Sequence, residues 1–301
     1  MSENITHTAL FDDGFRLMAA SPEICDAFKT FNEDQRRFGR LGGITRHGDF
    51  STVKLLTLYR EKWEARTPED RLEAKLAFVL GWLTHRAADR QMKPVFREAE
   101  PNRDYSPSHC SIYHDAFVFH EIYAGGKTGP YHPAMFDSKL ESLPISQVLD
   151  VPAVEEMFQT LMQRALLELH TFIPDDDNID GWLDRLFKLR QKFSVDRERY
   201  AQAIAQPNPE WYQRFIVEMN FYDRDEPILR TARAIQHGES VAPEEVAAAV
   251  AAPAKSHYAQ ALQMGYIYIR AASDFFVSDM TPDELNRQFK IGELGRDGKP
   301  V

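Results

Sequence analysis

Two residues four positions apart in an apolar stretch are the first candidates for chemistry in this sequence. The stretch from Leu76 to Pro94 is LAFVLGWLTHRAADRQMKP and contains His85 and Asp89. Residues four apart in a helix project from one face about one turn apart, so these two side chains can bind a common cation or one another. Gly81 lies one turn earlier, where a glycine often marks the close approach of another backbone or of a ligand. The stretch therefore predicts one wall of a polar site with two metal-type ligands.

The distribution of histidines favours a metal site over an isolated polar contact. Most of the ten histidines lie in the N-terminal half of the chain, whereas His170, His237 and His257 stand alone and are expected to be structural or exposed. One histidine on an apolar helix is more often a hydrogen-bonded core residue, so it is the number of histidines that favours metal binding. Imidazole and carboxylate side chains together suit zinc and similar transition metals.

Composition and charge limit the classes of protein to consider. The 301 residues are 43% hydrophobic and 12% aromatic, enough for a substantial core, and we favour one domain. The 46 acidic residues outnumber the 36 Lys and Arg, giving a formal charge of −10 that argues against a broad surface for nucleic acid or anionic membranes. Neither a secretory signal nor a membrane span is recognisable, and two cysteines fit reduced thiols, so we expect a cytoplasmic protein. Oligomeric state is not indicated.

Hydrophobic periodicity predicts helices along most of the chain. No segment alternates as a half-buried strand does, so the expected fold class is all-α and multi-helical. The predicted helices cover residues 4–20, 22–38, 51–65, 67–94, 106–125 and 255–278, with further helices from 151 onward and a short helix or hinge at 246–254. The segment RFGRLGGITRHGDF, with four glycines, is expected to be an irregular loop that carries His47 and Asp49. Residues 1–130 would form the half with the metal site and 151–301 a helical C-terminal half.

Three segments within the first 125 or so residues resemble the zinc-dependent phospholipase C family, whose architecture also occurs in certain single-strand-specific nucleases. THTALFDDGFRLM resembles the opening helix of the family, which implies a ligand role for His7. RLGGITRHGDF resembles the Gly-rich loop with an acidic ligand, where His47 or Asp49 stands in this chain. LGWLTHRAADRQMKP resembles the glycine-helix-HxxxD element, which implies that His85 and Asp89 are ligands and that Asp89 can bridge two metals.

The last ligand motif of the family is altered in this chain. The family has an HxxxE element, whereas here His114 is followed four positions later by Val118. The nearest acids are Asp115 and Glu121, and Glu121 lies two helical turns after His114 on the same side. We expect His114 and Glu121 to complete the ligand set, because a helical side chain leans toward the N-terminus and brings Glu121 back toward His114.

The resemblance implies a metal-dependent hydrolase that acts on a small phosphoester or phospholipid-like substrate. One to three ions of zinc or another divalent transition metal would activate water, and Asp49 would accept a proton. One alternative is an HD-type phosphohydrolase, suggested by His85 followed by the doublet His114-Asp115. Another is a non-catalytic helical binding protein with a vestigial metal site. The sequence does not define the substrate or the metal.

Overall fold

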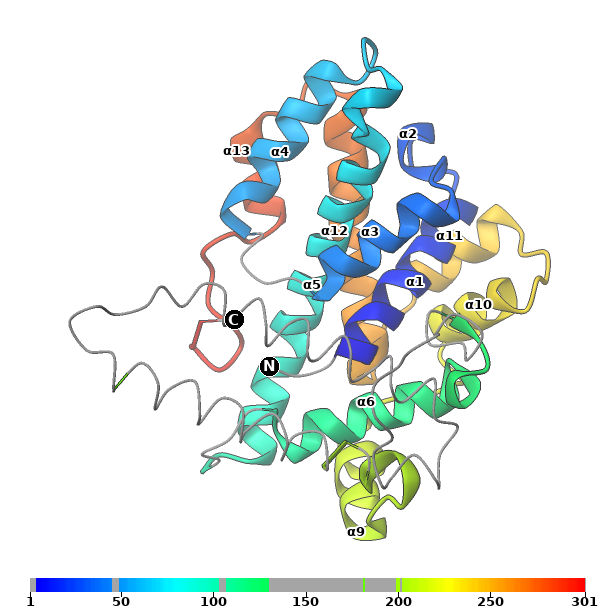
Figure 1. Ribbon diagram of the computed structural model, residues 1–301, viewed down its shortest axis with the longest axis vertical. Helices are drawn as coiled ribbons and strands as arrows, with labels where there is room; N and C mark the ends of the chain where they lie inside the picture. Colours follow the sequence, from blue (N-terminus) through cyan, green and yellow to red (C-terminus); the bar gives the residue numbers. More distant parts are fainter. Residues whose placement is uncertain are drawn as a thin grey trace. The chain divides into compact units, whose positions relative to one another are not determined.

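The computed structural model describes residues 4–44, 49–102, 107–129, 181, 199–200 and 202–300, and these residues form helices and no strands (Figure 1). The all-α prediction is therefore confirmed for the part of the chain that is described. None of the helices found there combines the length and the apolar character needed to cross a membrane. The helices predicted between 130 and 198 lie outside the described residues.

The chain divides into two compact units, and each of them is discontinuous in sequence. One unit contains Met1–Thr6 and Asn102–Ile216, and the other contains His7–Pro101 and Val217–Val301. The first unit contains α6 (His109–Glu121), η2 (Ala124–Gly126) and α9 (Pro209–Tyr212). These units do not coincide with the expected N-terminal and C-terminal halves, and the single-domain organisation stays a prediction.

The second unit holds most of the described helices. From its N-terminal segment come most of α1 (Asn4–Ala20), and then α2 (Asp26–Lys29), α3 (Glu33–Ile44), α4 (Asp49–Lys62), η1 (Pro68–Asp70) and α5 (Leu72–Ala99). Its C-terminal segment adds α10 (Pro227–Gln236), α11 (Pro243–Ala251), α12 (His257–Val277) and α13 (Pro282–Gln288). The π-helical turn η6 (Gln213–Glu218) spans the boundary between the units.

The first part of the glycine-rich segment is a helix where a loop was expected, and residues 45–48 lie outside the described residues. Residues Glu33–Ile44 form α3, with Gly39, Gly42 and Gly43 buried inside it. A Cβ atom at Gly42 would lie 2.0 Å from the carbonyl oxygen of Phe78, and one at Gly81 would lie 2.0 Å from the carbonyl oxygen of Gly39. The glycines therefore let α3 and α5 touch backbone to backbone, which outweighs their low helix propensity. The close backbone approach predicted at Gly81 is confirmed.

Two further boundaries differ from the predictions for local reasons. The helix expected over 22–38 is interrupted, because the side chains of Asn32 and Gln35 each accept a hydrogen bond from the backbone N–H of the other, at 2.9 Å, and start α3 there. The helix expected to begin at Thr67 is split by Arg71, whose left-handed backbone separates η1 from α5. That helix also continues through Pro94 to Ala99, although an interior proline removes one backbone hydrogen bond.

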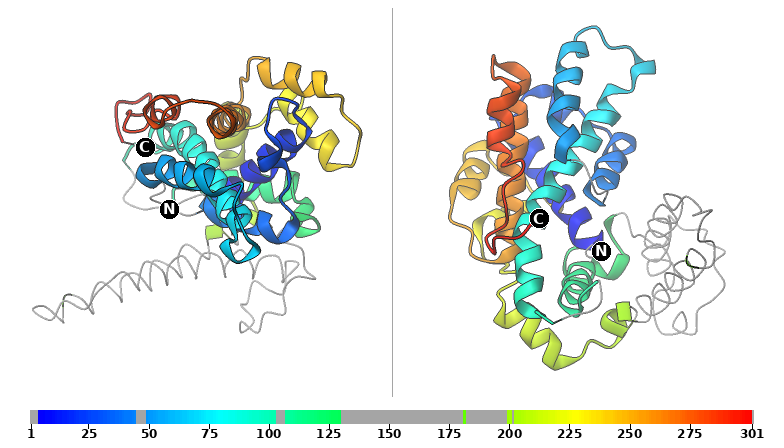
Figure 2. Two further views of the ribbon diagram at one scale, coloured as in Figure 1. Left: turned by 90° about the horizontal axis from the view of Figure 1, so that it is seen from above. Right: turned by 90° about the vertical axis from the view of Figure 1, so that its left-hand side faces the viewer.

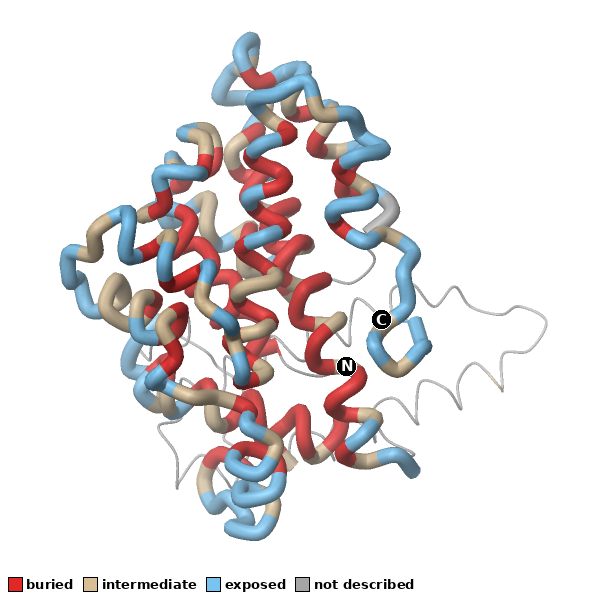
Figure 3. The backbone as a smooth tube through the Cα atoms, turned by 180° about the vertical axis from the view of Figure 1, so that it is seen from behind, coloured by how far each residue is buried: buried red, intermediate tan, exposed pale blue. Residues whose placement is uncertain are grey.

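The long helices α5 and α12 form the centre of the second unit, where they lie side by side (Figure 2). Gly265 of α12 faces Thr84 and Ala87 of α5 at ordinary contact distances. Buried residues concentrate where the helices of a unit face one another, and exposed residues lie on the outer turns (Figure 3). The last long helix was predicted over 255–278, close to its observed bounds, and Ser256 caps it by accepting from the N–H of Ala259.

Candidate metal centre

Two helices of the second unit bring together three of the residues selected from the sequence. His7 lies in the second turn of α1, and His85 and Asp89 occupy successive turns near the middle of α5. One ligand atom from each of the three lies within 4.8 Å of the other two. Among the residues that the structure describes, this is the one group of three or more such donors. We refer to it below as the metal group.

A backbone carbonyl sets the orientation of the His85 ring. Nδ1 of His85 lies 2.7 Å from the carbonyl oxygen of Gly43, and because a carbonyl only accepts, Nδ1 carries the hydrogen and donates it. Nε2 then points at Asp89, with Oδ2 at 3.2 Å. Metal-bound histidines commonly donate their second N–H to a carbonyl or carboxylate in this way. The contact exists because the glycines of α3 allow its last turn to reach α5.

His7 closes the group from the side of α1. Its ring stacks on that of His85, with centroids 4.4 Å apart and planes 18° from parallel, and its Nε2 lies 3.7 Å from Oδ1 of Asp89. The His7 side chain is 2% exposed and that of Asp89 is 16% exposed. The carboxylate therefore stands between two imidazole nitrogens at the edge of the core, with access to solvent on one side.

The surroundings keep Asp89 ionised. Burial acts to raise the pKa of this carboxyl group, but the positive charge of His85 and the hydrogen bond from it act in the opposite direction. His7 and Lys93 lower it further, so the pKa of Asp89 lies well below its ordinary value of 3.8. An anionic carboxylate is the form that ligates a cation.

Lys93 is a member of the site that the sequence analysis missed. Its Nζ lies 2.6 Å from Oδ2 of Asp89, and its side chain is 32% exposed. The signal was present in the sequence, because Lys93 follows Asp89 by four positions on the same helical face. A metal ion bound by Asp89 would lie near this ammonium group, and the repulsion between the two cations would favour a Lys93 side chain turned toward solvent.

The spacing within the metal group suits a small transition-metal ion. For bonds of about 2.05 Å, two ligand atoms of a tetrahedral ion lie roughly 3.3 Å apart. Oδ1 of Asp89 lies 3.7 Å from Nε2 of His7 and Oδ2 lies 3.2 Å from Nε2 of His85, while one ligand atom from each of the three residues lies within 4.8 Å of the others, so the three side chains would close in slightly around one ion. An ion held by these three side chains would keep a fourth position for water or substrate, as catalytic zinc sites do.

The other predicted ligands are not part of this group. His47 lies outside the described residues, and Asp49 begins α4 with a side chain that is likewise outside the description. His114 and Glu121 belong to α6 in the first unit. Among the described residues of that unit, no three His, Cys, Asp or Glu side chains lie close enough together to hold a metal ion. The structure therefore unites His7, His85 and Asp89 and leaves the remaining assignments as predictions.

His114 and Asp115 both have packing contacts within the first unit. The fully buried His114 donates from Nε2 to the carbonyl oxygen of Phe215 at 3.1 Å. Asp115 accepts at Oδ1 from the backbone N–H and the hydroxyl of Thr6, both at 2.8 Å, and at Oδ2 from the hydroxyl of Tyr200 at 3.0 Å. Both carboxylate oxygens are engaged by hydroxyl or amide donors, as expected of a residue that caps the start of α1. This engagement weighs against the HD-type alternative, in which the His114-Asp115 doublet would bind metal.

Comparisons of this chain with models of known protein families, with curated proteins and with solved structures found no match.

Proposed function

We propose that this protein is a metal-dependent phosphoester hydrolase whose metal ion is bound by His7, His85 and Asp89. The observation that carries the proposal is the convergence of three donor atoms from α1 and α5 within 4.8 Å, with the His85 ring oriented by Gly43. The same three residues are those for which the resemblance to zinc-dependent phospholipases C implies ligand roles. The proposal extends to zinc or another divalent transition metal and to a small phosphoester or phospholipid-like substrate.

The residues of the site have separate tasks in this proposal. When bound, a divalent transition metal lowers the pKa of its water and offsets negative charge on phosphoryl oxygens. Asp89 supplies the anionic ligand, and because Nδ1 of His85 donates to Gly43, Nε2 is the nitrogen that would bind the metal after losing its proton. Lys93 adds a partly exposed positive charge at the rim, which attracts an anionic substrate. Asp49 remains the proposed proton acceptor.

Metal content is the measurement that tests the proposal first. Protein purified without added metal should contain a transition metal by elemental analysis, and His85→Ala or Asp89→Asn should lower its metal affinity at least roughly tenfold, because each removes one ligand of three. His237→Ala changes a histidine at the end of α10, outside the metal group, and should keep full metal content. Wild-type protein that neither contains nor binds metal at micromolar concentration would favour the non-catalytic binding protein.

Separate measurements identify the residues that bind the metal and the reaction that the protein catalyses. His7→Ala should lose metal, whereas Asp115→Asn should retain it, since only the arrangement proposed here uses the first helix. The opposite pattern would favour the HD-type phosphohydrolase. Hydrolysis of p-nitrophenyl phosphate and bis(p-nitrophenyl) phosphate then tests the reaction, and metal binding without hydrolysis of any phosphoester in a wider panel would restrict the role to metal binding.

A further inference from the structure

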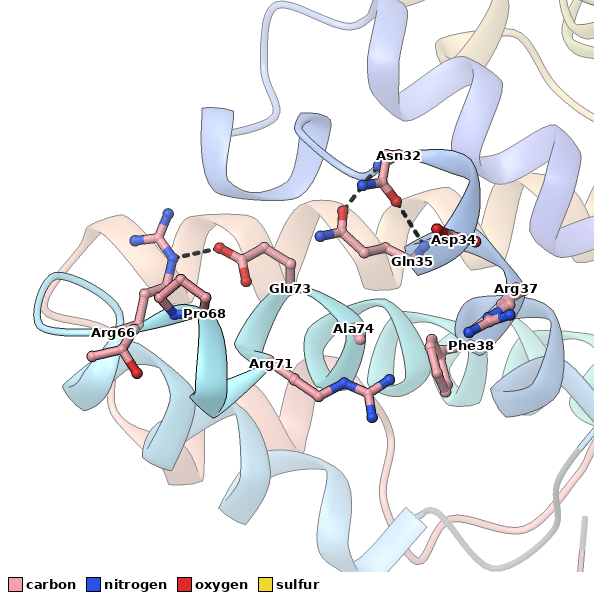
Figure 4. Close-up of a pocket in the computed structure, with 11 residues that line it drawn as sticks. Asn32, Asp34, Gln35, Arg37, Phe38, Arg66, Pro68, Arg71, Glu73 and Ala74 are labelled. Carbon is pink, nitrogen blue, oxygen red and sulfur yellow. Dashed lines mark hydrogen bonds and ion pairs between the residues drawn. The ribbon is translucent and has the colours of Figure 1, made fainter.

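A second polar site lies in the same unit, in a groove between the first half of α3 and the segment that leads into α5. The groove has a volume of about 700 Å³ and is lined by residues from 32–38 and 66–74 (Figure 4). We call it the arginine groove, because Arg37, Arg66 and Arg71 all line it. Volumes of this size are typical of pockets for small ligands.

Two of the three arginines are available to a ligand. The guanidinium groups of Arg37 and Arg71 each lie 5.1 Å from the centre of the Phe38 ring, and Figure 4 shows that ring between them. Neither group forms an ion pair with any carboxylate of the described chain. Arg66 differs, because its Nε donates to Glu73 at 2.6 Å. The groove therefore presents two uncompensated guanidinium groups held by one aromatic ring.

The other polar groups in the groove are already satisfied or exposed. Asn32 and Gln35 form reciprocal hydrogen bonds at the start of α3, and the Thr67 hydroxyl lies 3.2 Å from Asp70. Asp34 is the remaining acid, and it is exposed. A ligand in the groove would therefore be recognised mainly through its interaction with the two guanidinium groups.

Arg71 has a backbone conformation that is uncommon for an arginine. Its φ of 50° and ψ of 38° place it in the left-handed region, which glycine adopts without cost and other residues adopt rarely. A glycine would suit the junction between η1 and α5 better than arginine does. Arg71 is the C-terminal cap of η1, and from this position its guanidinium group lies 5.1 Å from the centre of the Phe38 ring.

We propose that the arginine groove binds a small phosphate-bearing ligand. Each guanidinium group offers a planar fork of N–H donors that matches two oxygens of one anion. A phosphomonoester has three terminal oxygens and close to two negative charges at neutral pH, enough to engage both forks, whereas one carboxylate satisfies only one of them. The site is separate from the metal group, because His85 follows Arg71 on α5 by about 20 Å along the helix axis at 1.5 Å per residue. The proposal does not depend on the proposed hydrolase activity.

Calorimetric titration of the full chain with inorganic phosphate, at constant ionic strength, tests this assignment. Wild-type protein should bind phosphate at millimolar concentration or tighter and should bind acetate, whose single carboxylate satisfies one guanidinium fork, more weakly. Arg37→Ala and Arg71→Gly should each weaken phosphate binding about tenfold or more, since each removes charge-assisted hydrogen bonds. Arg71→Gly should keep a melting temperature close to that of the wild type, because glycine relieves the left-handed strain.

Two matched variants separate the arginine groove from other sources of binding. Arg230→Ala removes an exposed arginine from α10, outside the groove, and should leave phosphate affinity unchanged. Asp89→Asn impairs the metal group and should also leave it unchanged, so failure of the hydrolase proposal is distinguishable from failure of this one. Absence of phosphate binding by the wild type, equal binding of acetate, or wild-type affinity in both arginine variants would each overturn the assignment.

Discussion

A single hydrogen bond at His85 determines which of its ring nitrogens is available for chemistry. Because Nδ1 of His85 donates a hydrogen bond to the Gly43 carbonyl oxygen, Nε2 is the ring nitrogen that faces Asp89. The orientation of the His85 ring therefore depends on a residue that is distant in sequence, because Gly43 belongs to α3 and His85 to α5. The hydrogen bonds of Asp115 likewise come from residues that are distant in sequence, Thr6 and Tyr200.

Asp115 should make stability depend on pH in a direction opposite to that of carboxylates that ion pairs keep ionised. Burial raises the pKa of Asp115 from 3.8 to about 6, although hydrogen bonds from Thr6 and Tyr200 lower it. Between those values the folded state holds the proton more tightly than the unfolded state, so the free energy of unfolding falls as pH rises from 3.8 to about 6 and is level above that. Asp115→Asn should remove this contribution, which is roughly 2 to 3 kcal/mol at 1.36 kcal/mol per pKa unit.

Urea unfolding of wild type and Asp115→Asn between pH 4 and 7 gives the measurement. The stability advantage of the wild type over the variant should shrink as pH rises through the window. Asp279→Asn, at an exposed acid, should follow the wild-type curve throughout. A wild-type advantage that stays constant between pH 4 and 7 would show that Asp115 ionises at its ordinary pKa.

At the scale of elements, the pairing of α3 with α5 supports both of the sites described above. The glycines of α3 and Gly81 remove the side chains that would separate the two backbones. One end of this helix pair then brings the Gly43 carbonyl to His85, and the other end places Arg37 and Phe38 opposite Arg71. A change in the separation of these helices should therefore affect both sites.

Gly81→Ala should destabilise the protein and weaken metal binding. The added Cβ would lie 2.0 Å from the Gly39 carbonyl oxygen and 2.6 Å from the Gly43 nitrogen, and backbone atoms cannot move aside as a flexible side chain can. We expect a loss of at least roughly 2 kcal/mol of unfolding free energy, since overpacking outweighs the gain in helix propensity. Thermal and urea unfolding, followed by metal titration of the folded fraction, measures both effects.

Gly265→Ala is the matched control for that experiment. It also places alanine in the middle of a buried helix, but its Cβ would meet Thr84 and Ala87 at 3.6 and 3.8 Å, which is ordinary contact. This variant should be as stable as the wild type or more stable by up to about 1 kcal/mol. If the two alanine variants behaved alike, the close approach of α3 and α5 would not be what limits substitution at Gly81.

At the scale of the whole molecule, both compact units combine segments from distant parts of the sequence. The unit that holds the metal group needs residues 217–301, because α12 packs against α5 and α4. Gln91 of α5 contacts His257 and Gln260 of α12, and Arg60 of α4 donates to the Phe275 carbonyl oxygen at 3.0 Å. The N-terminal half therefore lacks part of its own core.

A fragment of residues 1–130 should not fold or bind metal, although it contains all three residues of the metal group. Without α12, the face of α5 that carries Thr84 and Ala87 is exposed to water, and the apolar burial that stabilises α5 is lost. Circular dichroism should show little cooperative unfolding, and elemental analysis should find no bound metal. A fragment that unfolded cooperatively and retained metal would establish the N-terminal half as an autonomous domain.

The sequence by itself determined the fold class, most helices and the shared helical face of His85 and Asp89, while His7 was added by the resemblance to a known family. The period of apolar residues is a local property, and it located α1 and α12 within two residues. The spacing of His85 and Asp89 placed both on one helical face because helix geometry is also local. Gly81 was correctly associated with close backbone contact for the same kind of reason.

Only the tertiary structure decided that the glycine-containing segment forms α3 and which groups distant in sequence come into contact. Local propensity disfavours a helix over Gly39, Gly42 and Gly43, and backbone contact with α5 reverses that preference. The orientation of His85 by Gly43 and the placement of Arg37 opposite Arg71 involve residues more than 30 positions apart. No periodicity encodes such pairings, because they follow from how whole helices pack.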